Sequence, residues 1–128
     1  MSKNDVTVLV IEDEKPTREA LAKALVNRGF AVLQAADGSE GFSLALKRHP
    51  EIILLDLMMP KMNGMEVLKS LRQDAWGKTV PVILLTNMPT DDAVIKEIVE
   101  EHPTFYLVKS DWKLEDVLHK VEQTLEMM

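Results

Sequence analysis

The sequence predicts an α/β domain in which a five-stranded parallel sheet carries helices on both faces. Two hydrophobic periods alternate along the 128 residues, one typical of strands and the other typical of helices. Three of the strand-like segments are continuously apolar, as strands are when helices cover the sheet on both sides. Right-handed crossovers connect such strands, so we expect one doubly wound domain over residues 1–128.

Five short segments rich in aliphatic residues are the predicted strands. They cover residues 6–11, 31–35, 52–56, 80–86 and 105–109. The order 2-1-3-4-5 is common among doubly wound sheets, and its winding reverses between the first and third strands. Periodicity alone does not determine the strand order, but we take this common order as the expectation, and with it a ligand crevice beyond the carboxyl ends of the strands.

Signals for helix starts and ends separate the predicted strands. Pro16 suits the first position of a helix, and Gly29 suits its exit. Asp37 and Asn63 each precede a glutamate by three residues, as in a capping box, and Thr90 can cap a fourth helix. The last helix has an apolar stripe made of Leu114, Val117, Leu118, Val121 and Leu125. Five helices are therefore expected, distributed over both faces of the sheet.

The composition excludes several classes of function. The net charge of -6 argues against a surface that binds nucleic acid or anionic lipid. The absence of cysteine rules out disulfides, thiolate metal sites and a cysteine nucleophile. No apolar run approaches the ~20 residues of a membrane span, and the polar start MSKND is unlike a signal peptide. We therefore expect a cytoplasmic protein that makes no direct contact with nucleic acid or membrane.

Polar side chains stand where four of the predicted strands end. Glu12 and Asp13 follow the first strand, Asp56 ends the third, Thr86 the fourth and Lys109 the fifth. Because the carboxyl ends of parallel strands meet at one edge of the sheet, these side chains are expected to converge there.

Three clustered carboxylates repel one another unless a cation neutralises them. Oxygen ligands select hard ions, and few carboxylates with open water positions suit Mg²⁺. Asp56 is then a candidate nucleophile towards a phosphoryl group. Thr86 and Lys109 would supply a hydrogen-bond donor and a positive charge for the phosphoryl oxygens.

Four motifs resemble those of one known family. VIEDE, LLDLMMPKMNG, LLTN and YLVKS together resemble the receiver domain of two-component response regulators. Its pattern D-x-x-M-P-x-M-x-G is filled by Asp56, Met59, Pro60, Met62 and Gly64. The resemblance runs from the first strand to the last helix and implies a flavodoxin-like fold. We expect a single receiver similar to chemotaxis regulators, without an output domain. The sequence leaves open whether it is a stand-alone regulator, a shuttle in a phosphorelay or the first domain of a longer protein.

The resemblance implies a role for each residue at the metal site. Asp56 corresponds to the phosphoryl acceptor, and Glu12 and Asp13 to the acidic pair that binds Mg²⁺. The main-chain carbonyl of Met58 corresponds to a further metal ligand.

The resemblance also implies a conformational switch. Thr86 would hydrogen-bond the phosphoryl group, Lys109 would pair with it, and Tyr106 matches the aromatic residue that turns inward on activation. In the family, a proline in a cis peptide bond commonly follows the lysine, whereas Ser110 stands here. A cis bond before a non-proline residue costs roughly 3 to 4 kcal/mol, so the sequence leaves the isomer of the 109–110 bond open.

The function implied is a phosphorylation-dependent signalling switch. A sensor histidine kinase or a phosphotransfer protein would donate the phosphoryl group to Asp56. The surface formed by the fourth helix, fifth strand and fifth helix would then change and regulate a downstream effector protein. Only self-phosphorylation and self-dephosphorylation are expected, so the protein is not predicted to be an enzyme.

Three alternatives share this fold class. A phosphohydrolase with an aspartate nucleophile uses a D-x-D pair, and Met58 occupies the second position here. A flavin or nucleotide binder cradles phosphate after the first strand, where this chain has the repulsive stretch EDEK. An interaction module that is never phosphorylated would not need acidic, hydroxyl and amine side chains at all of these strand ends, and this chain has all of them.

Overall fold

The computed structural model describes residues 5–57, 62–86, 100, 105–108 and 113–126. Within these residues, strands and helices alternate as the sequence predicts as far as the fourth strand, and no described helix separates the fourth strand from the fifth. The strands are β1 (Thr7–Ile11), β2 (Ala31–Ala35), β3 (Ile52–Asp56), β4 (Val82–Thr86) and β5 (Phe105–Val108). The helices are α1 (Lys15–Asn27), α2 (Gly38–Arg48), α3 (Gly64–Gln73) and α5 (Leu114–Glu126).

The strands form one parallel sheet in the order β2-β1-β3-β4-β5. This is the order that the sequence favours, with the reversal of winding between β1 and β3. Its register aligns the ends of neighbouring strands, because Ile11 lies opposite both Ala35 and Leu55. The helix predicted to begin near Thr90 and the peptide bond between residues 109 and 110 lie outside the described residues.

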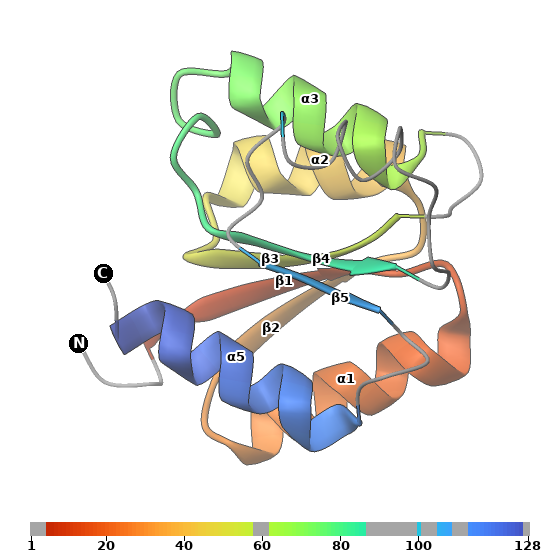
Figure 1. Cartoon of the computed structure of the whole chain (residues 1–128), viewed down its shortest axis with the longest axis vertical. Coiled ribbons are helices and arrows are strands. Elements are labelled where there is room, and N and C mark those ends of the chain that lie inside the picture. Colours follow the sequence, from red (N-terminus) through yellow and green to blue (C-terminus); the bar gives the residue numbers. More distant parts are fainter. Residues whose placement is uncertain (1–4, 58–61, 87–99, 101–104, 109–112, 127–128) are drawn as a thin grey trace.

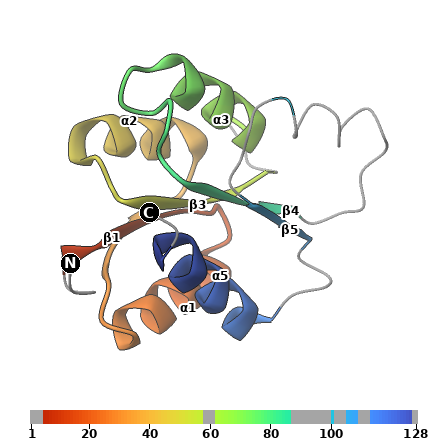
Figure 2. The same cartoon turned by 60° about the vertical axis from the view of Figure 1, so that its left-hand side comes forward.

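Helices cover the sheet on both faces (Figure 1), and a second view shows the same layering (Figure 2). Helices α2 and α3 lie on one face, and α1 and α5 lie on the other. All five residues of β3 are buried, which explains why its sequence lacks the alternation of a half-exposed strand.

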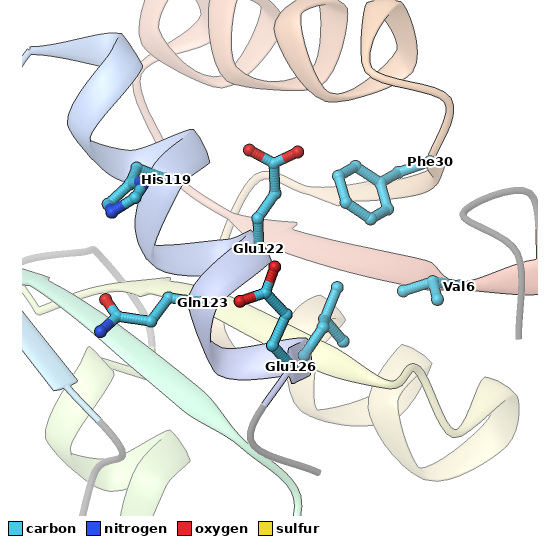
Figure 3. Close-up of a pocket in the computed structure, with 7 residues that line it drawn as sticks. Val6, Phe30, His119, Glu122, Gln123 and Glu126 are labelled. Atoms are coloured by element: carbon cyan, nitrogen blue, oxygen red, sulfur yellow. The ribbon is translucent and has the colours of Figure 1, made fainter.

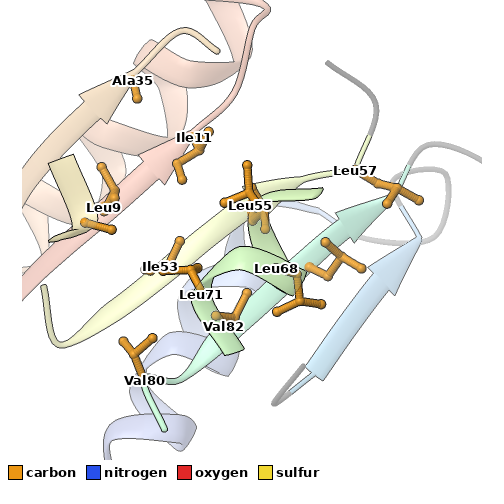
Figure 4. Close-up of a cluster of buried hydrophobic side chains, with 13 residues drawn as sticks. Leu9, Ile11, Ala35, Ile53, Leu55, Leu57, Leu68, Leu71, Val80 and Val82 are labelled. Atoms are coloured by element: carbon orange, nitrogen blue, oxygen red, sulfur yellow. The ribbon is translucent and has the colours of Figure 1, made fainter. Parts of the chain in front are cut away.

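Side chains alternate between two hydrophobic cores on the faces of the sheet. Leu9, Ile53 and Leu55 belong to the core beneath α2 and α3 (Figure 4). Leu54 belongs to the core shared with α1 and α5, as does Val10. The two cores hold the carboxyl ends of β1 and β3 in fixed positions side by side.

Two predicted helix caps are confirmed. The Asp37 carboxylate accepts a 2.8 Å hydrogen bond from the Glu40 N–H, and the Asn63 side chain accepts one of 3.0 Å from the Glu66 N–H. Gly29 follows α1 with a φ of 98°, a conformation that favours glycine. No helix in the described part of the chain combines the length and apolar character needed to cross a membrane.

Candidate functional site

Asp56 is the last residue of β3 and is only 2% exposed. It lies opposite Leu85 of β4, and the next residue, Leu57, donates a 2.9 Å hydrogen bond from its N–H to the Leu85 carbonyl. The sheet therefore continues to fix the main chain just beyond the carboxylate. A buried strand flanked by partners on both sides holds Asp56 in one position, as a reacting group requires.

Glu12 and Asp13 follow β1 directly. The Glu12 N–H donates to the Ala35 carbonyl at 3.1 Å, which extends the β1–β2 pairing by one residue. The Glu12 side chain is fully buried, and its Oε2 accepts a 3.2 Å hydrogen bond from the Glu14 N–H. Asp13 is half-buried. The main chain that carries both acids is thus anchored to the sheet at Glu12.

Glu12, Asp13 and Asp56 form a single acid cluster, in which one carboxylate oxygen of each lies within 4.8 Å of the others. The register explains their convergence, because Ile11 pairs with Leu55 and the residues that follow each are the acids. At about 5 Å, two unit charges repel by roughly 3 kcal/mol at an effective dielectric constant of about 20. A cation at the cluster would convert this repulsion into attraction.

The donor set fits a hard divalent cation. All three side chains offer carboxylate oxygens, and no nitrogen or sulfur ligand belongs to the cluster within the described residues. Mg²⁺ takes one or two carboxylates and keeps water at its remaining positions. A soft metal would prefer imidazole or thiolate ligands. The oxygen donors of the acid cluster therefore fit a hard divalent cation, and the assignment to Mg²⁺ stays a prediction.

Gly64 brings the start of α3 against the strand that carries Asp56. Its N–H donates to the Leu57 carbonyl at 2.9 Å. A Cβ added at Gly64 would lie 2.3 Å from the carbonyl oxygen of Asp56 and 2.6 Å from the Cα of Leu57. The sequence motif includes this glycine, but the close approach of two main chains that requires it is visible only in the structure.

Arg18 is a contact residue of the site that sequence reasoning missed. Its Nη1 donates to the Glu12 carbonyl at 3.0 Å and makes a longer contact of 3.5 Å with the Asp13 carbonyl. The available signal was an arginine in the second turn of the helix that follows the acid pair. Nothing in the hydrophobic pattern distinguishes it from an ordinary surface arginine.

Other predicted site residues are described in part or lie outside the described residues. The main chain of Thr86 ends β4 opposite Val108, one position beyond the partner of Asp56. Tyr106 lies in β5 opposite Leu84. Met58 and Lys109 lie outside the described residues. The roles of all four in phosphoryl binding, metal binding or switching stay predictions.

A cavity of about 620 Å³ lies at the other end of the sheet and contains none of these residues (Figure 3). Val6 and Phe30 precede β1 and β2 respectively, so the cavity is at the amino ends of the strands. Its lining consists of Val6, Phe30, His119, Glu122, Gln123, Leu125 and Glu126. The candidate chemistry therefore lies in the acid cluster at the carboxyl ends of the strands and not in this cavity.

Comparison with known proteins identifies the family. The family described as "Response regulator receiver domain" matches residues 8–122. Transcriptional regulatory protein CusR of Escherichia coli (strain K12) is 38% identical over 102 residues, which make up 80% of this chain and 44% of CusR. PhoB, the phosphate regulon transcriptional regulatory protein of Pseudomonas aeruginosa, is 34% identical over 90 residues, or 70% of this chain and 39% of PhoB. The chain spans less than half the length of these relatives.

Solved structures agree with this assignment. The chemotaxis response regulator CheY4 of Vibrio cholerae superposes with a TM-score of 0.83 at 29% identity, over 92% of this chain and 97% of CheY4. The receiver domain of a signal transduction histidine kinase from Syntrophus aciditrophicus has a TM-score of 0.87 at 24% identity, over 96% of this chain and 92% of that domain. The second likeness is evidence for the fold alone.

A doubly wound sheet with an acid cluster at its carboxyl edge defines a signalling domain of the receiver class. The chain belongs to the response regulator receiver domain family of two-component systems. Receiver domains are signalling modules of two-component systems.

Proposed function

We propose that Asp56 accepts a phosphoryl group from a phosphohistidine donor and that Mg²⁺ is required for the transfer. The observation that carries this proposal is the acid cluster, because it surrounds a rigid strand-end aspartate with two further carboxylates. Glu12, Asp13 and Asp56 would hold the cation, together with the main-chain carbonyl of Met58. When bound, Mg²⁺ supplies positive charge to the phosphoryl oxygens in the transition state.

The transfer exchanges one bond for another. A carboxylate oxygen of Asp56 bonds to phosphorus as the phosphorus–nitrogen bond of the donor breaks, and the ring nitrogen that keeps the electron pair takes a proton from solvent to give neutral imidazole. Thr86 donates a hydrogen bond to the phosphoryl group and Lys109 pairs with its negative charge. The position of Thr86 at the end of β4, next to β3, supports its part in this arrangement.

The signal would leave the domain through the surface formed by the predicted fourth helix, β5 and α5. Strand β5 pairs with β4 over four residues, and Val108 lies opposite Thr86. A movement of Thr86 towards the phosphoryl group would therefore act on the strand that carries Tyr106. Tyr106 would report the phosphorylated state by changing its orientation. A downstream effector protein would recognise the altered surface.

Intact mass spectrometry tests the proposal directly. The parent protein is incubated with Mg²⁺ and acetyl phosphate, beside Asp56→Ala and the control Asp5→Ala, whose exposed side chain lies at the amino end of β1. We expect one added phosphate in the parent and in the control, and none in Asp56→Ala or in the presence of EDTA.

Two results would contradict the proposal. A parent protein that gains no phosphate, with donor and metal shown to be active, would instead support an interaction module that is not phosphorylated. Repeated release of phosphate from a phosphomonoester, lost in Asp56→Ala, would support the aspartate-nucleophile phosphohydrolase.

A further inference from the structure

Arg18 connects α1 to the loop that carries the acidic pair. Its guanidinium Nη1 lies 3.0 Å from the Glu12 carbonyl oxygen and 3.5 Å from that of Asp13. Its main-chain N–H donates to the Glu14 carbonyl at 2.9 Å. One residue therefore contacts the main-chain carbonyls of three successive loop residues. Hydrogen bonds from a charged donor are stronger than neutral ones, so the side-chain contact to Glu12 is the most favourable of these.

Among the hydrogen bonds within the described residues, few others connect the loop to the helix. Glu14 is the N-cap residue of α1, but its side chain makes no capping hydrogen bond. On the sheet side, the Glu12 N–H bonds to Ala35, and the Glu12 carboxylate accepts from the Glu14 N–H. The sheet thus anchors the first residue of the loop, and Arg18 anchors the same segment from the helix. Without Arg18, the Asp13 carbonyl would lose its contact with a side chain of α1.

We propose that Arg18 is a positioning residue that holds Glu12 and Asp13 in the geometry required for cation binding before the cation arrives. This inference rests on the proposed function, in which the acid cluster is the magnesium site. Arg18 acts through the main chain and does not itself touch the cation. Removal of a group that hydrogen-bonds to metal ligands and orients them commonly lowers metal affinity by roughly 10- to 100-fold.

Charge and positioning predict opposite effects of replacing Arg18. A guanidinium near the cluster repels an incoming cation, so the loss of its charge alone would strengthen Mg²⁺ binding. The loss of positioning would weaken binding, because the ligands must then be ordered when the cation binds. The direction of the change in affinity therefore separates the two explanations.

The test compares Arg18→Met with Lys15→Met. Lys15 lies in the same helix and carries the same charge, but the contact described for its side chain is a surface ion pair with Glu19 at 3.9 Å. Mg²⁺ titrations are followed by backbone amide NMR. We expect the dissociation constant of Arg18→Met to rise roughly tenfold, and that of Lys15→Met to stay unchanged or fall. Arg18→Lys, which keeps the charge and one donor, should recover part of the affinity.

Hydrogen exchange in metal-free protein provides a second readout. The Glu14 amide, which donates to the Glu12 carboxylate, should exchange faster in Arg18→Met than in the parent or Lys15→Met, while core amides of β3 keep their protection. The positioning role would be overturned if the Glu14 amide exchanged at the same rate in Arg18→Met and in the parent. It would also be overturned if Arg18→Met bound Mg²⁺ as tightly as Lys15→Met does. If the parent binds no Mg²⁺, the proposed function fails, and the exchange rates still decide whether Arg18 orders the loop.

Discussion

Asp13 is the most accessible member of the acid cluster, since Glu12 is fully buried and Asp56 is 2% exposed. Its carboxylate is therefore the one that can be altered with least disturbance of packing. In metal-free protein, all three carboxylates repel one another at close range. The negative charges that repel one another would together attract a divalent cation. Stability and metal binding should accordingly change in opposite directions when one charge is removed.

We predict that Asp13→Asn stabilises the metal-free protein by about 1 to 3 kcal/mol, because one carboxylate no longer repels the other two. The same variant should lose most of the stabilisation by Mg²⁺, which for an intact site is about 2.7 kcal/mol when Mg²⁺ is at 100 times its dissociation constant. Thermal unfolding in EDTA and in Mg²⁺ measures both effects. An equal gain from Mg²⁺ in the parent and in Asp13→Asn would show that Asp13 is not a ligand.

At the scale of elements, the start of α3 determines where the strand end of β3 can lie. Gly64 lets the two main chains approach, and any Cβ there would overlap main-chain atoms of Asp56 and Leu57. Main-chain atoms cannot move aside as a flexible side chain can. If a side chain replaced the hydrogen of Gly64, either helix α3 or the main chain of Asp56 would therefore have to shift.

We predict that Gly64→Ala destabilises the protein by about 1 to 3 kcal/mol, although alanine is the better helix former by about 1 kcal/mol. It should also slow phosphorylation of Asp56 by acetyl phosphate, because the acceptor is displaced. Denaturant unfolding and timed intact mass measure the two effects. Ser70→Ala, in the same helix, is the control. Parent-like stability and rate in Gly64→Ala would contradict this account of the close approach.

Helices α1 and α5 are joined at the surface by Arg28. Its guanidinium pairs with Glu115 and, at 2.6 Å, with Glu122. The hydrogen bond with Glu115 and the charges of both glutamates raise the pKa of Arg28 above its ordinary value. Surface pairs of this kind contribute little individually and are screened by salt.

We predict that Arg28→Met lowers the midpoint of urea unfolding slightly at low ionic strength and that the difference from the parent shrinks in 1 M NaCl, where the Debye length is roughly 3 Å. Lys15→Met, which removes a charge from α1 without contacting α5, is the control. A difference that is independent of salt would show that Arg28 acts through packing of its aliphatic stem.

At the scale of the whole molecule, β3 belongs to both hydrophobic cores. Leu54 faces the core of α1 and α5, and its neighbour Leu55 faces the core of α2 and α3. Both side chains are completely buried. Loss of either core would therefore free the strand that the other core needs, and the two layers should unfold together.

We predict that Leu54→Ala and Leu55→Ala each destabilise the protein by about 2 to 5 kcal/mol and that each variant still unfolds in a single transition. Val26→Ala, at a side chain that is 55% exposed, should cost much less. Urea unfolding followed by far-ultraviolet circular dichroism and by tryptophan fluorescence measures both quantities. Transitions that separate between these probes would contradict a single cooperative unit.

Patterns within a few residues were sufficient to predict most of the fold and the acid cluster. The aliphatic run that ends at Asp56 is buried on both faces, and parallel pairing of β1 with β3 places the acids after Ile11 beside it. Strand period and strand ends are local properties, so they can be recognised without knowing how the helices pack. The caps at Asp37 and Asn63 were predictable for the same reason.

The packed structure was needed for the contacts that hold this arrangement in place. Arg28 meets residues 87 and 94 positions away in the chain, and Gly64 is required by the exact distance between two main chains. Arg18 bonds to main-chain carbonyls five and six positions before it, a side-chain contact that the hydrophobic pattern does not indicate. Hydrophobic patterns indicate which face of an element is buried, but they do not specify the distances and angles at which elements pack. The sequence therefore predicts which residues form the site, and the tertiary structure shows which residues hold them there.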